Sequence, residues 1–95
     1  MRVQFLERQG GPERLVCEAE VIFDEDGPLA GMKLCGFSLW RGADADVAVT
    51  FPPRSFGAGG ERRFFDYLRV VETGSDDARR VKDWILSEYR QTVTA

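Results

Sequence analysis

Residues 15–24 alternate in polarity with a period of two, and this pattern constrains the fold more than any other in the chain. Cys17, Ala19, Val21 and Phe23 fall on one side, and Glu18, Glu20, Ile22 and Asp24 on the other. Such alternation predicts a half-buried strand. Asp26-Gly27 follows, and this dipeptide is a strong signal for a tight hairpin turn. Residues 29–40 are therefore predicted to be the returning strand.

The remaining pattern predicts strands at about 3–7, 15–24, 29–40, 45–51 and 62–71, and a helix over about 76–91. The alternation in 29–40 changes phase beside Gly36, which predicts a β-bulge or sharp bend. Pro52-Pro53 is expected to end the strand at 45–51. With 95 residues, we expect one domain over 1–95 of the α+β class, an antiparallel sheet of four to five strands with one C-terminal helix.

The predicted helix is amphipathic. Ser75 is expected to cap it, because a serine hydroxyl can accept from the first free amides of a helix. Its apolar stripe consists of Ala78, Val81, Trp84, Ile85 and Tyr89. One helix can cover only one face of an antiparallel sheet.

Large apolar side chains occur at both parities of the predicted strands, for example at Ile22 and Phe23 and at Phe64 and Phe65. Leaving half a dozen such groups in water would forfeit on the order of 10 kcal/mol. A second copy is the simplest cover, so the pattern predicts a homodimer. The alternative is that bends and loops of one chain fold over the second face.

Composition excludes several function classes. The net charge is −3, and the chain has no histidine, so His-based catalysis and His-ligated metals are excluded. No nucleophile–base pair is evident, and we expect no enzyme, no cofactor, no metal and no small-molecule substrate. The start of the sequence lacks a signal-peptide pattern and no run is long enough to span a membrane, which predicts a cytoplasmic protein. There, Cys17 and Cys35 are expected to be small buried residues, although a hairpin disulfide is geometrically conceivable.

A basic cluster stands out from the acidic background. Arg54, Arg62 and Arg63 bracket the glycine-rich residues 57–60. Phe56 lies among them as a candidate for stacking on a base, and Arg79, Arg80 and Lys82 occupy the first half of the helix. Arginine suits phosphate binding, and aromatic rings stack on bases, so the cluster predicts a nucleic-acid contact. The alternative is ordinary surface ion pairing with neighbouring acidic residues.

The order of these motifs resembles the SpoVG family, the stage V sporulation (septation) protein G group of small bacterial proteins. The resemblance covers roughly residues 14–91. It rests on the strand at 45–51 followed by Pro52-Pro53-Arg54-Ser55, on Gly59-Gly60-Glu61-Arg62, and on a final helix ending in Glu88-Tyr89-Arg90. Pro53 stands where the family has serine, and Phe51 where it has methionine.

The resemblance implies a dimeric α+β fold that binds DNA and RNA in gene regulation linked to sporulation and septation. Arg54 matches the family's basic residue after the Pro-Ser pair, and Arg79, Arg80 and Lys82 lie in its basic C-terminal region. We therefore expect a non-enzymatic, homodimeric regulatory protein that binds DNA or RNA. The alternative is a protein–protein interaction module of the same fold that does not bind nucleic acid.

Overall fold

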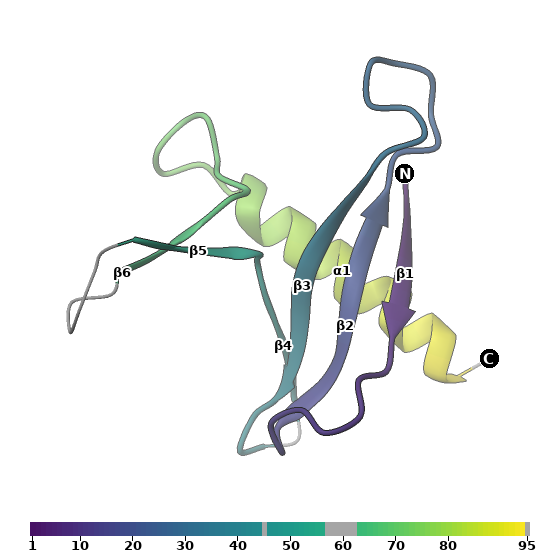
Figure 1. The fold of residues 1–95 in the computed structure, drawn as a ribbon, viewed down its shortest axis with the longest axis vertical. Coiled ribbons are helices and arrows are strands. Elements are labelled where there is room, and N and C mark those ends of the chain that lie inside the picture. The colour runs from purple at the N-terminus through teal and green to yellow at the C-terminus, as the bar shows by residue number, and fades with distance from the viewer. Residues whose placement is uncertain (45, 57–62, 95) are drawn as a thin grey trace.

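A four-stranded antiparallel sheet and one long helix form the body of the protein (Figure 1). The computed structural model describes residues 1–44, 46–56 and 63–94, and at 54–56, 63–65 and 94 it describes the backbone alone. The elements are β1 (Arg2–Leu6), β2 (Leu15–Ile22), β3 (Lys33–Arg41), β4 (Val47–Thr50), β5 (Pro53–Phe56), β6 (Arg63–Asp66) and α1 (Asp77–Thr94). The main sheet has the order β1-β2-β3-β4. The predicted α+β class, with an antiparallel sheet and a C-terminal helix, is confirmed.

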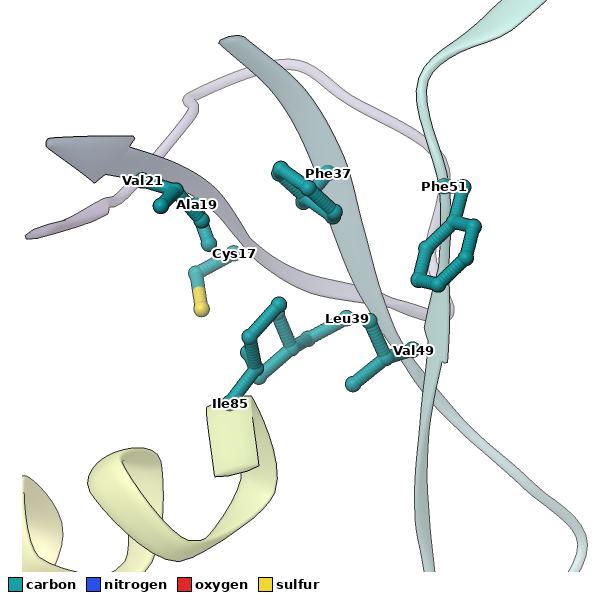
Figure 2. Close-up of a cluster of buried hydrophobic side chains, with 8 residues drawn as sticks. All are labelled: Cys17, Ala19, Val21, Phe37, Leu39, Val49, Phe51 and Ile85. Atoms are coloured by element: carbon teal, nitrogen blue, oxygen red, sulfur yellow. The ribbon is translucent and has the colours of Figure 1, made fainter. Parts of the chain in front are cut away.

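Helix α1 packs across one face of the main sheet, and the hydrophobic core lies between them (Figure 2). The buried apolar side chains are Cys17, Ala19, Val21, Phe37, Leu39, Val49, Phe51 and Ile85. The inward face predicted for residues 15–24 is therefore correct. So is the apolar stripe of the helix, because Ile85 is fully buried and Ala78, Val81, Trp84 and Tyr89 pack against the core.

A β-bulge interrupts the pairing of β2 with β3, as the phase change in the sequence predicted. Ala19 pairs with Phe37 and Val21 with Leu34, so two residues of β3 lie opposite the single residue Glu20 of β2. Gly36, one of those two, has a φ of +103°, a backbone conformation that favours glycine. The extra residue shifts side-chain parity by one. Leu34 and Phe37 therefore both face the helix.

The sheet face opposite α1, called here the reverse face, is more polar than the sequence predicted. In the described part of the chain, hydrogen bonds run along it from Trp40 Nε1–H to Thr50 Oγ1 at 2.9 Å and from Lys33 Nζ to Glu20 Oε1 at 3.1 Å. The bulge moves Leu34 to the helix side, whereas Trp40 lies on the reverse face, so the expectation of apolar groups on both faces is met only in part among the described residues. The homodimer stays a prediction.

Strands β5 and β6 form a separate two-stranded ribbon rather than further strands of the main sheet (Figure 1). Pro52-Pro53 was expected to end a strand, and β4 does end at Thr50, but Pro53 is the first residue of β5. The strand expected over 62–71 is shorter, since β6 ends at Asp66. Tyr67 donates its backbone N–H to the Pro52 carbonyl at 2.9 Å, which closes the base of the ribbon.

The hairpin between β2 and β3 is wider than a two-residue turn. β2 ends at Ile22 and β3 begins at Lys33, and Phe23 N–H donates to the Met32 carbonyl at 2.9 Å. This width and the bulge also separate the two cysteines. Cys17 pairs with Leu39 and is buried, whereas Cys35 is exposed opposite Glu20. Both thiols are free, so the expectations of a buried Cys35 and of a conceivable hairpin disulfide are wrong.

Helix α1 begins one residue later than its predicted cap implies. Arg80 N–H donates to the Asp76 carbonyl at 3.0 Å, so Asp76 occupies the N-cap position and not Ser75. The hydroxyl of Ser75 is buried and has no hydrogen-bond partner within the described residues. No helix among the described residues is both long and apolar enough to cross a membrane.

Candidate nucleic-acid interface

Positive charge is concentrated in one stretch of this acidic chain. Residues 51–82, called here the basic segment, hold seven of the 13 lysines and arginines but only five of the 16 acidic residues, a net charge of +2. The other residues hold six basic and eleven acidic groups, a net charge of −5. The basic segment comprises the ribbon, the loop that follows it and the start of α1. The positive charge of this acidic chain is therefore concentrated in the basic segment.

The ribbon carries part of the predicted site. Backbone pairing sets Arg54 opposite Phe65 and Phe56 opposite Arg63. The ribbon projects away from the main sheet in Figure 1, so these positions lie apart from the hydrophobic core. The side chains of Arg54, Phe56 and Arg63, and the whole of Arg62, lie outside the described residues. Their predicted contacts stay predictions.

The first turns of α1 carry the other predicted residues, and all three side chains are exposed. Arg79 Nη2 lies 3.7 Å from Asp76 Oδ2, an ion pair in which both side chains are 72% exposed. Exposed pairs of this kind contribute less than about 1 kcal/mol to stability. Arg79 thus makes a surface ion pair, at little energetic gain. The Arg79 guanidinium would remain available to exchange Asp76 for a phosphate.

Lys82 contacts the segment that leads from β4 into the ribbon. Its Nζ lies 5.3 Å from the centre of the Phe51 ring, a cation–π contact. Phe51 is buried against Phe37 and stands two residues before β5. The basic start of α1 therefore lies at the base of the ribbon. Residues separated by about thirty positions in the chain meet there, which sequence patterns alone did not indicate.

A surface hollow of about 600 Å³ lies at this junction, between the ribbon base, the loop that follows and the first turn of α1. Its lining is Phe51, Asp66, Leu68, Arg69, Val70, Thr73 and Ala78. Arg69 was not among the predicted site residues, and its Nε donates to the Asp66 carbonyl at 3.1 Å. The hollow therefore places one more guanidinium between the two predicted halves of the site. A lone arginine in a loop gives no sequence signal that would have singled it out.

A second polar cluster, on the reverse face, was also missed. Cys35 Sγ–H donates to Glu20 Oε2 at 3.0 Å, and Lys33 Nζ donates to Glu20 Oε1. The hydrogen bonds from Cys35 and Lys33 lower the pKa of Glu20, and the bond to Glu20 raises the pKa of Cys35. A raised pKa leaves little thiolate at neutral pH, so this thiol is not activated as a nucleophile. Only the bulge brings the three side chains together.

Comparisons of this chain with protein-family models, with curated proteins and with solved structures find no significant match.

Proposed function

We propose that the protein is a non-enzymatic, SpoVG-like regulatory protein that binds DNA or RNA through its basic segment. The observation that carries this proposal is the contact between Lys82 and Phe51, which sets the exposed basic turn of α1 at the base of the ribbon bearing Arg54 and Arg63. A polyanion that runs along the ribbon to α1 would meet basic residues at both ends of its path. Guanidinium groups suit such a backbone, since they form paired hydrogen bonds to phosphate oxygens.

The proposal includes a homodimer. In the described residues β5 and β6 pair only with each other, so the outer edge of each strand offers unpaired backbone groups. A two-stranded ribbon is marginally stable by itself, and pairing with a second copy would extend it. A dimer would also present two basic segments to one nucleic acid. Sedimentation equilibrium tests this part, and a monomer at all concentrations would remove it.

The experiment is a titration of labelled single-stranded DNA, duplex DNA and RNA at about 50 mM and 200 mM salt. We expect binding that weakens as salt rises, because each neutralised phosphate releases counterions. The Arg79→Ala/Arg80→Ala variant should bind more weakly, with the slope of log affinity against log salt reduced by up to about 2.

The matched control is Arg14→Ala/Arg41→Ala. These arginines lie where β3 ends, with Arg41 N–H donating to the Arg14 carbonyl at 2.8 Å, and they are outside the basic segment. The control changes the net charge by the same amount and should leave the salt slope unaltered. No binding at low salt, or equal losses in both double variants, would refute the proposal.

A protein-interaction module is the second candidate, and the wide hairpin favours it. Leu29 and Met32 at this hairpin are 55% and 60% exposed, although both are large and apolar. Such side chains commonly mark contact sites for other proteins when they gather on one surface. Substitution Leu29→Ser/Met32→Ser should then abolish partner capture and leave nucleic-acid titrations unchanged. Under the nucleic-acid proposal, the same variant binds nucleic acid as tightly as the wild type.

A further inference from the structure

An apolar cavity of about 240 Å³ lies between the main sheet and the first half of α1. Six of the residues that line it are Val21, Leu34 and Phe37 from the sheet, Leu68 from the loop after β6, and Val81 and Trp84 from the helix. The cavity is partly open to solvent, and all eight described residues that line it are apolar. It is separate from the hollow at the ribbon base apart from the shared Leu68.

A hollow of this kind is unusual in a small domain. Protein interiors are close-packed, with few voids larger than a water molecule. Apolar walls offer water no hydrogen-bond partners, so such a space holds water only weakly. An engineered cavity of about 150 Å³ in another protein binds benzene. The present cavity therefore has room for an aromatic ring that carries substituents.

The chemistry of the lining selects the class of ligand. Phe23, Phe37 and Trp84 all face this space, and aromatic rings pair favourably edge to face or offset. No charged or hydrogen-bonding side chain lines it among the described residues other than the indole of Trp84. A charged ligand would lose its hydration without compensation. We propose that this cavity is a binding site for a small uncharged aromatic molecule.

Met1 and Phe23 provide the route of entry. Both also line a second hollow of about 240 Å³ over the hairpin, so their side chains separate the two spaces. The Met1 side chain is about half exposed, and methionine side chains change rotamer readily. Movement of Met1 would widen the opening of the cavity along the hairpin without unfolding the sheet or α1.

The two tryptophans allow a direct test, because Trp84 lines the cavity whereas Trp40 lies on the reverse face. In the Trp40→Phe protein, Trp84 is the sole tryptophan, and its emission is followed during titration with toluene, methylcyclohexane and benzoate. We expect saturable 1:1 binding of toluene, weaker binding of methylcyclohexane, and none of benzoate. Absence of toluene binding up to its solubility limit, or benzoate binding as tight as toluene, would overturn the proposal.

Substitutions that fill the cavity with a larger side chain are compared with one that adds the same bulk elsewhere. Val81→Phe, in the same Trp40→Phe background, should weaken toluene binding at least about tenfold and raise the thermal midpoint. Val71→Phe adds the same bulk at a fully exposed position and should change the affinity by less than about twofold. Leu68→Phe fills the cavity from a different element if Val81→Phe does not fold. Toluene binding that survives in both folded filling variants places the ligand elsewhere and refutes the proposal.

Discussion

Replacing Gly36 by alanine tests the geometry that turns the chain from the main sheet into the ribbon. Gly36 has a φ of +103°, and a Cβ added there would lie 3.0 Å from the Cβ of Pro52. The backbone conformation alone costs a non-glycine residue about 1–3 kcal/mol. Overpacking against Pro52 adds about 1–3 kcal/mol, because Pro52 is buried and held by its own backbone. We expect Gly36→Ala to lower the free energy of unfolding by about 2–6 kcal/mol.

The assay is urea unfolding followed by far-UV circular dichroism, analysed by linear extrapolation. Gly31→Ala is the control, since Gly31 has a φ of +85° but nothing within 4 Å of an added Cβ. The Gly31→Ala variant should show only the cost of placing a non-glycine residue at a positive φ. In a double-mutant cycle, Pro52→Gly removes the nearest atom and should recover about 1–3 kcal/mol of the Gly36→Ala cost. If Gly36→Ala costs no more than Gly31→Ala, the close approach to Pro52 has no energetic role.

Three further predictions concern the core and the reverse face. Ile85→Ala removes a fully buried side chain and should cost about 2–5 kcal/mol in urea unfolding, whereas Val93→Ala should change stability by less than about 0.5 kcal/mol. The folded-state pKa of Glu20 is lowered, so its carboxylate stabilises the fold at pH values above its unfolded pKa, and this contribution is lost as pH falls through the lowered value. The urea midpoint of Glu20→Gln should therefore fall less steeply than that of the wild type below about pH 5. The same substitution should speed the reaction of Cys35 with iodoacetamide near pH 8, because the carboxylate that raises its pKa is gone.

Each of these predictions has a clear contrary result. Equal costs for Ile85→Ala and Val93→Ala would mean that α1 does not pack as described. Parallel pH profiles for the wild type and Glu20→Gln would show that this carboxylate has the same pKa in the folded and unfolded chains. An unchanged alkylation rate, measured by mass spectrometry with Cys17→Ala to isolate Cys35, would contradict the Cys35–Glu20 hydrogen bond.

The sequence pattern predicted the buried face of a strand or helix correctly where apolar residues recur at a regular spacing. The alternation of Cys17, Ala19 and Val21 predicted the face turned toward the helix, and the three- and four-residue spacing in α1 predicted Ile85 as a core residue. The phase change beside Gly36 predicted the bulge itself. Its consequence was missed, because parity on the far side of a bulge depends on which residue is left unpaired. The position of Leu34 on the helix side was missed for that reason.

The candidate site was less accessible to sequence reasoning. The arginines at 54, 62, 63, 79 and 80 were visible as a cluster in the sequence, since charge is a local property. The contact of Lys82 with Phe51 depends on how α1 crosses the sheet, and no local pattern encodes that crossing. The position of Arg69 in the hollow at the ribbon base also depends on the tertiary structure, so no local pattern indicates it. The Glu20–Cys35 hydrogen bond depends on the register between β2 and β3, so the sequence did not predict it either.

The core lies between the main sheet and α1, and this has an evolutionary consequence for the ribbon. The buried apolar residues come from β2, β3, β4, α1 and Phe51-Pro52 just after β4, and the two side chains described in β5 and β6, Pro53 and Asp66, are exposed. The ribbon is tied in at its base, where Tyr67 meets Pro52. Substitutions at Pro53 and Asp66 would therefore be tolerated by the scaffold. Changes at these two positions could alter what the ribbon contacts during evolution without destabilising the sheet and the helix.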